Sequence, residues 1–412
     1  MKPAVLLSSP KLLWPLGLAL LVLTVWLVSP GRAHRWGGFS FSPRDGAGFQ
    51  VVPGPWGELE VWDLRLEIPE EFVGKEELAP RPTRWNFGNI TEADARQLLA
   101  VQGCTTADTE AILRSARTEP GFGALVAEPP EEVVLRIPPE VRSRLYLFLS
   151  RNPANRYYQE PVYLPGAQVE RILRKKSFSS PREIRRLLER LVYPRNGFAY
   201  FSDPEIILRH LPNDGERMEF LRSIFAVDAV QAGLRILPGS DLEKPLTYWT
   251  RAMPGVTAKD LKPLLESFRN LQDPGSLSLL YVLPPMARLR LYTTPKPEEM
   301  AAAKPPDCHW TALNFFRNEP DPRLSDNAYA SEFIKNHYYQ IGRANQPGDL
   351  LLVLNPQGQV IHSATYIAAD LYFTKNGLNV AQPWVLMREK DLTPLFSKLV
   401  PARLAYFRKK EL

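Results

Sequence analysis

Cysteine and histidine are scarce in this chain: its 412 residues include two cysteines and five histidines. No group of these residues has the spacing of a zinc site, so we expect no bound metal. The sequence also lacks a low-complexity region and a repeat of fixed period, which excludes repeat architectures. Two cysteines are compatible with either side of a membrane, so they do not indicate a compartment.

A strong net charge is absent as well. The 51 basic and 45 acidic residues leave a formal charge of +6, and the basic residues are spread through the chain. Nucleic-acid binding is therefore not expected, whereas attraction to an acidic envelope or membrane surface is compatible with this charge. The 40 prolines favour many short elements, and the length allows two or three domains.

One apolar run stands out near the N-terminus. Residues 12–28 are uncharged and just long enough to span a bilayer, and Trp14 and Trp26 suit its two interfaces. We therefore interpret residues 1–35 as a single-pass membrane anchor, with the bulk of the chain on the extracytoplasmic side. A cleaved signal peptide is the alternative, although residues 31–33 make a poor cleavage site.

Residues 36–295 are predicted to form a mainly helical domain with an early strand. Residues 58–66 alternate between apolar and polar side chains, as a half-buried strand does. Several helix starts follow, of which residues 180–183 (Ser-Pro-Arg-Glu) are the clearest. Residues 277–283 read as a further strand, and we place the domain boundary near residue 295.

The first candidate for chemistry is Cys308, at the predicted start of a helix within the stretch 306–316. Asp307 can cap this helix, and the positive end of the helix dipole would favour a nucleophilic thiolate. Two alternatives remain open: a small buried core residue, and one half of a disulfide with Cys104.

The second candidate is His362, which lies on a predicted strand over residues 359–367. A lone histidine on an apolar strand is often a satisfied core residue. Its position after Cys308 nevertheless fits a general base. His309 follows the cysteine directly, so it cannot share the same helix face, and we expect it to line the pocket.

These motifs resemble the NlpC-type branch of papain-like cysteine peptidases and amidases. The likeness covers residues 304–396 and rests on Asp307-Cys308, on the strand after Gly348-Asp349, and on His362 with the Tyr-Ile pair that follows it. It implies a papain-like α+β domain with a small antiparallel sheet over residues 296–412. The chain differs from this branch in carrying His309-Trp310 where a small residue usually follows the cysteine.

The branch places a third, polar residue on the strand after the histidine. An odd-length connection would put Thr374 and Asn376 on the face of His362, and an even one would put Lys375 there. Asn376 is the first choice because its amide oxygen can hold an imidazole N–H. The alternative is that Asn376-Gly377 is only a turn dipeptide.

The predicted fold is therefore α+β: an N-terminal transmembrane helix, a mainly helical middle domain and a C-terminal papain-like domain. The predicted function is an envelope thiol hydrolase that cleaves amide bonds through Cys308, His362 and Asn376, without a cofactor. Cell-wall peptides are the substrates that the resemblance implies. A non-catalytic envelope binding protein with a degenerate papain-like domain, and a lipid acyltransferase, are the alternatives. The sequence sets no expectation for the oligomeric state.

Overall fold

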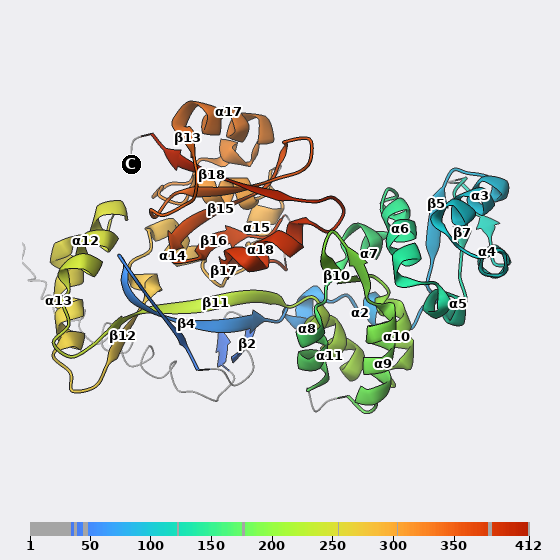
Figure 1. Cartoon of the computed structure of the whole chain (residues 1–412), viewed down its shortest axis with the longest axis horizontal. Coiled ribbons are helices and arrows are strands. Elements are labelled where there is room, and N and C mark those ends of the chain that lie inside the picture. Colours follow the sequence, from blue (N-terminus) through green and yellow to red (C-terminus); the bar gives the residue numbers. More distant parts are fainter. Residues whose placement is uncertain are drawn as a thin grey trace, which may run out of the picture.

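A computed structural model of the chain describes the backbone of two short strands near the N-terminus and most residues beyond them. The described ranges are 34–36, 39–43, 48–121, 123–174, 178–253, 255–302, 304–377 and 381–410. They form an elongated molecule in which the C-terminal sheet stands above a long strand pair, with helices at both ends of that pair (Figure 1).

The long pair consists of β4 (Gly57–Leu66) and β11 (Val227–Ile236), which are antiparallel. Their register runs from Leu66 opposite Val227 to Glu58 opposite Arg235. The other strands of this sheet are β1 (His34–Trp36), β2 (Phe39–Pro43), β3 (Gln50–Gly54) and β12 (Gly275–Ser278), in the order β1-β2-β4-β11-β12 with β3 beside β4. Because Leu66 and Val227 are partners, residues 67–226 leave and rejoin the sheet at one point and form an insertion.

The insertion has a hydrophobic core of its own, built from residues between Ile68 and Phe225 together with Ala381 of the C-terminal part. It holds two three-stranded sheets: β5 (Trp85–Gly88), β7 (Leu125–Ala127) and β6 (Arg117–Thr118); and β8 (Val162–Tyr163), β10 (Phe198–Phe201) and β9 (Tyr193–Arg195). Its helices are α2 (Lys75–Leu78), α3 (Glu92–Gln102), α4 (Thr106–Leu113), α5 (Glu131–Arg136), α6 (Pro139–Leu149), α7 (Arg156–Gln159), α8 (Gly166–Leu173), α9 (Pro181–Leu191), α10 (Pro204–His210) and α11 (Asp214–Ile224).

The predicted helix start at residues 180–183 is confirmed, because α9 begins at Pro181. One face of the helix is apolar and buried, with Ile184, Leu187, Leu188 and Leu191 on it. The Ser180 side chain, however, makes no capping hydrogen bond. The proline at the first helical position and the helical spacing of the apolar residues therefore specify this helix without a side-chain cap.

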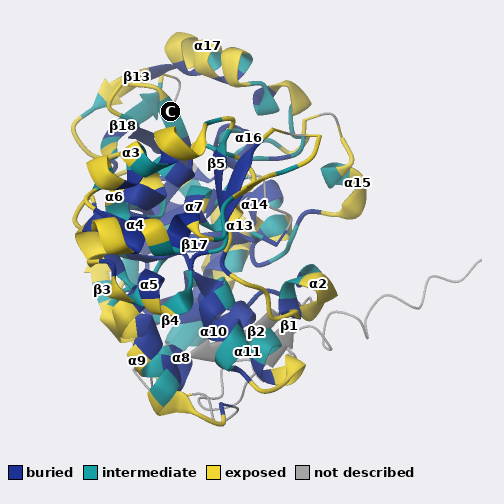
Figure 2. Cartoon of the chain, turned by 90° about the vertical axis from the view of Figure 1, so that its right-hand side faces the viewer, coloured by how far each residue is buried: buried dark blue, intermediate teal, exposed yellow. Residues whose placement is uncertain are grey.

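The C-terminal part is a six-stranded antiparallel sheet. Its order is β13 (Tyr338–Ile341), β18 (Arg403–Lys409), β14 (Leu350–Leu354), β15 (Val360–Ala368), β16 (Leu371–Lys375) and β17 (Trp384–Arg388). The helices of this half are α12 (Glu243–Ala252), α13 (Ala258–Arg269), α14 (Pro285–Arg290), α15 (Pro297–Met300), α16 (Cys308–Leu313), α17 (Asn327–His337) and α18 (Glu389–Phe396). Strands such as β17 are buried, whereas α15 and α17 expose much of their surface (Figure 2).

The C-terminal sheet and the β4–β11 sheet share one hydrophobic core. Trp384 of β17 links the C-terminal sheet to the segment after α14: its carbonyl accepts the Tyr292 N–H at 2.7 Å, and its own N–H donates to the Thr293 carbonyl at 3.0 Å. The Tyr292 hydroxyl in turn donates to the Val230 carbonyl of β11. The Trp384 side chain is fully buried in the same core. Residues before and after 295 are thus packed together, and the predicted boundary stays a prediction.

The fold class predicted from the sequence was wrong. The structure is α+β, but residues 36–295 contain two small sheets and the long strand pair, so they are not a mainly helical domain. The C-terminal sheet has six strands and is not small. The predicted transmembrane helix at residues 12–28 lies outside the described residues, and within them no helix has the length and apolarity needed to cross a bilayer.

Trp384 lies fully buried in the shared core, so its replacement by a small residue should destabilise the protein. We expect Trp384→Ala to lower the free energy of unfolding by about 3–5 kcal/mol, because a large buried side chain leaves a cavity. Leu289→Ala is the control: this leucine is 77% exposed on α14, and its removal should change stability by less than about 0.5 kcal/mol. Urea denaturation of both variants gives the two free energies of unfolding. Equal decreases in the two variants would contradict a special contribution of Trp384 to the core.

Candidate active site

Cys308 is the first residue of α16, as predicted. The Asp307 carboxylate caps the helix by accepting the Trp310 N–H at 2.7 Å. Cys308 is only 6% exposed, and both cysteines are free thiols. Cys104 belongs to the core of the insertion. The disulfide alternative therefore does not describe this structure, while the nucleophile and the buried core residue remain.

Successive side chains of β15 point to opposite faces of the sheet. Ser363 and Thr365 face α16: the Ser363 hydroxyl is 2.7 Å from Nδ1 of His309, and the Thr365 hydroxyl donates to the Ala312 carbonyl at 3.2 Å. His362 faces the opposite side, where its ring stacks on Phe396 of α18 with centroids 3.9 Å apart.

The next strand follows the same division. On the α18 side, the Thr374 hydroxyl is 2.9 Å from Nε2 of His362, and the Asn376 amide donates to the sulfur of Met387 at 3.1 Å. On the α16 side, Lys375 pairs with Trp384, whose indole N–H donates to Thr311 of α16 at 2.9 Å.

A β-bulge sets this division. The connection between Ala368 and Leu371 has two residues, which alone would place Lys375 on the face of His362. Between Tyr366 and Ala368, however, Ile367 is an extra residue on β15, and the register shifts by one. The connection therefore acts as one of odd length, which puts Lys375 on the opposite face from His362. The carbonyl of the bulged Ile367 accepts a hydrogen bond from the Tyr248 hydroxyl at 2.8 Å.

The structure therefore does not bring the three predicted residues together. Cys308 lies on the α16 face of the sheet, whereas His362 and Asn376 lie on the α18 face. No hydrogen bond joins Cys308 to either of them in the described part of the chain. The triad stays a prediction, and its assembly would require a rearrangement of the sheet or of α16.

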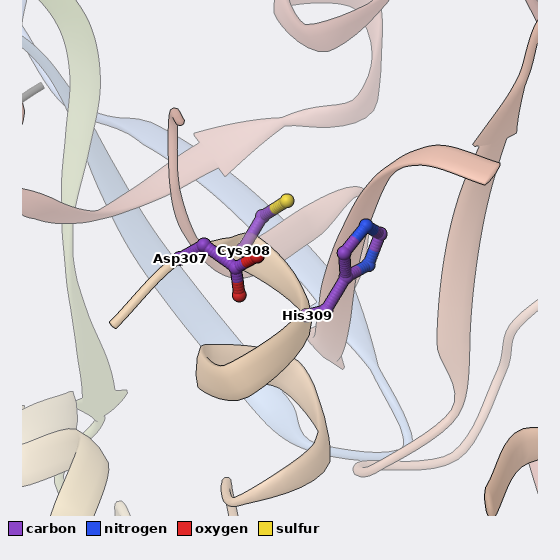
Figure 3. A group of neighbouring side chains, drawn as sticks. All are labelled: Asp307, Cys308 and His309. Atoms are coloured by element: carbon purple, nitrogen blue, oxygen red, sulfur yellow. The ribbon is translucent and has the colours of Figure 1, made fainter. Parts of the chain in front are cut away.

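Other polar residues do share the face of Cys308: His309, Ser363 and Lys375. Figure 3 shows Asp307, Cys308 and His309 beside one another at the start of α16, with side chains that point in different directions. Their ligand atoms nevertheless lie within 4.8 Å of one another. Sequence reasoning assigned His309 to the pocket wall, gave no role to Ser363, and considered Lys375 only for the face of His362. Strand alternation would have found the latter two if His362 had been placed on the other face.

Burial raises the pKa of the Cys308 thiol to about 12, and the negative charge of Asp307 adds to this effect. The backbone N–H groups of Ser363, His309 and Cys308 itself act in the opposite direction. The pKa of His309 is lowered by burial, against the pull of Asp307. Desolvation thus outweighs the helix dipole, and the resting pair is a neutral thiol beside a neutral imidazole.

Lys375 is buried completely, and burial lowers the pKa of its ammonium group to about 8. Negative charge on Cys308 or Asp307 raises that pKa again. The Nζ atom donates to the Gly377 carbonyl at 2.5 Å and lies 5.9 Å from the centre of the Trp384 ring. An amine that can lose its proton near neutral pH therefore shares a face with the thiol.

Two polar atoms on the α18 face are buried without a hydrogen-bond partner among the described residues: Nδ1 of His362 and Oδ1 of Asn376. Each unmet group costs about 1–3 kcal/mol. Burial, with a smaller contribution from His309, lowers the pKa of His362 well below its usual range. His362 is thus a neutral core residue in this conformation.

A cavity of about 390 Å³ lies near the far end of α16, lined by residues such as Ala312, Phe316, Phe333 and Tyr338. Its lining does not include Cys308.

Comparison with protein-family models, with curated sequences and with solved structures finds no match to this chain.

The raised pKa of Cys308 predicts slow alkylation of the folded protein. Iodoacetamide should label Cys308 at pH 7 at least about ten times more slowly than a free cysteine of pKa about 8.5, and the rate should still be rising at pH 10. Unfolding in urea should remove the difference. Peptide mass spectrometry gives the rates, with Cys104 as the second buried thiol. Rapid labelling below pH 7 would show instead that the sulfur is a thiolate.

The lowered pKa of His362 predicts a loss of stability in acid. Below pH 6.5 the unfolded chain binds a proton at this position that the folded chain does not, so stability falls as the pH falls. The contribution is at most about 1.4 kcal/mol per pH unit. His362→Gln should flatten the decrease in unfolding free energy between pH 7 and 5. Parallel curves for the two proteins would contradict this.

Proposed function

We propose that the C-terminal part of the chain is a thiol hydrolase that cleaves amide bonds, with Cys308 as the nucleophile. The observation that carries this proposal is the surroundings of the sulfur at the start of α16. Backbone N–H groups of Ser363 and His309 interact with it, and Lys375 shares its face of the sheet. Anionic sulfur is the species that such N–H groups and a neighbouring ammonium stabilise.

The reaction would begin when the thiol proton moves to a neutral base on the same face, either the imidazole of His309 or the amine of Lys375. The thiolate then attacks the carbonyl carbon, and the nearby backbone N–H groups can stabilise the resulting oxyanion. Collapse releases an amine that takes up the proton and leaves a thioester on Cys308. Water cleaves the thioester, which gives a carboxylic acid and the free thiol.

Peptides of the bacterial cell wall are the substrate class that the NlpC-type resemblance implies. Because Cys308 is only 6% exposed, a substrate carbonyl has to displace the side chains that cover the sulfur. Such displacement would also hydrate the site and bring the pKa of the thiol down, because burial is the largest cause of its increase.

A binding protein without catalysis is the second candidate. The burial of Cys308 and the position of His362 on the opposite face favour it, because neither residue is poised to act in this conformation. In that case the polar cluster on the α16 face would only stabilise the packing of the helix on the sheet.

Substitution of the nucleophile separates the two candidates. We expect the purified protein to cleave a cell-wall stem peptide, and we expect Cys308→Ala to reduce the rate by at least about 10³-fold. Cys104→Ala is the matched control and should retain the wild-type rate, since that thiol lies in the core of the insertion. Mass spectrometry of the products measures both rates.

Lys375→Met and His309→Gln then identify the base by the pH dependence of the rate. The deprotonation of the base should make the cleavage rate rise with pH on the acid side of the pH–rate profile. If this rise is lost in only one variant, the replaced residue is the base. Cleavage that survives in Cys308→Ala would contradict the proposed nucleophile.

A further inference from the structure

The start of α16 carries three different metal-ligand types in three consecutive residues. Asp307 offers a carboxylate, Cys308 a thiolate and His309 an imidazole, and their ligand atoms lie within 4.8 Å of one another (Figure 3). Cys308 is buried, and Asp307 and His309 are partly buried. Each of these is a ligand type that Zn²⁺ accepts, and three protein ligands leave a fourth tetrahedral position open.

The hydrogen bond between His309 and Ser363 prepares the imidazole for such a role. It engages Nδ1 at 2.7 Å, so that Nε2 can present its lone pair when Nδ1–H donates to the hydroxyl. Histidines that bind metals usually donate their second N–H to a fixed acceptor in this way, which holds the ring orientation.

The spacing is slightly wider than a bound ion requires. Ligands at about 2.0–2.3 Å from Zn²⁺ lie about 3.3–3.8 Å apart in a tetrahedron. The three atoms would therefore have to approach by up to about 1.5 Å, and we expect side-chain rotations to provide this. Asp307 can take part while one of its oxygens still caps the helix through the Trp310 N–H.

We propose that Asp307, Cys308 and His309 bind a thiophilic divalent cation of the Zn²⁺ class. Binding replaces the thiol proton, which passes to solvent, and forms a metal–sulfur bond while the imidazole and the carboxylate complete the protein ligands. If Cys308 is the nucleophile, as proposed above, the bound ion masks it and holds the hydrolase inactive.

The sulfur ligand sets the selectivity of this site, whereas Lys375 weakens the binding of every divalent cation. Its side chain interacts electrostatically with Cys308 and Asp307, so a positive charge on it opposes a cation held between them. Hard ions such as Mg²⁺ and Ca²⁺ gain little from a thiolate and would be excluded. A soft ion forms a strong bond to sulfur and can overcome the repulsion.

Cobalt titration of the full chain tests the site without any substrate. Under reducing conditions Co²⁺ should bind one-to-one and give a thiolate-to-cobalt charge-transfer band, and Zn²⁺ should remove that band by displacement. Cys308→Ser should abolish the band. His309→Ala should weaken binding at least about tenfold. Asp307→Asn should also weaken it, and this substitution keeps a good helix cap.

Two further variants serve as controls. Cys104→Ser should leave the titration unchanged, and Lys375→Met should strengthen binding by removing the opposing charge. Circular dichroism and urea denaturation of each variant exclude loss of the fold as the cause. Absence of the band with millimolar Co²⁺, or its survival in Cys308→Ser, would overturn the proposal.

The outcome is independent of the proposed hydrolase. A charge-transfer band without any amide cleavage would establish the metal site and leave the hydrolase unsupported. Cleavage that depends on Cys308, together with no band, would do the reverse. If both hold, Zn²⁺ should inhibit cleavage and a chelator should restore it, with Cys104→Ser behaving as the wild type.

Discussion

The antiparallel pairing of β4 with β11 is the interaction on which the rest of the structure depends. It joins segments that are about 160 residues apart in sequence, which is entropically costly and slow to form. Once formed, it closes residues 67–226 into an insertion with a separate core and provides the sheet against which the C-terminal part packs. The sheet that carries the site on α16 is therefore supported by a core that it shares with this strand pair.

Within the C-terminal sheet, the alternation of side chains decides which chemistry can occur. The bulge beside Ile367 assigns Lys375 to the face of Cys308 and Thr374 to the face of His362. Because of this single extra residue, the hydroxyl of Thr374 and not the amine of Lys375 lies beside His362. The Tyr248 hydroxyl stabilises this choice because it satisfies the carbonyl that the bulge frees.

Local features were predictable from the sequence, and long-range ones were not. The cap at Asp307 and the helix start at Pro181 depend on neighbouring residues, and both are confirmed. The strand at residues 58–66 was recognised from its period, but its partner β11 was hidden in a region read as helical. The face of His362 depends on packing against Phe396, which no local pattern reveals.

Burial is the physical link between the possible roles of Cys308. A dry site raises the pKa of the thiol and keeps it unreactive, yet the same low dielectric strengthens any charge that is compensated within it. Proton transfer to Lys375 or His309 provides one compensation, and a bound cation provides another. Both act on the same sulfur, so they exclude each other. A thiol placed in this way is stable at rest and becomes anionic only when a base or a metal takes the place of its proton.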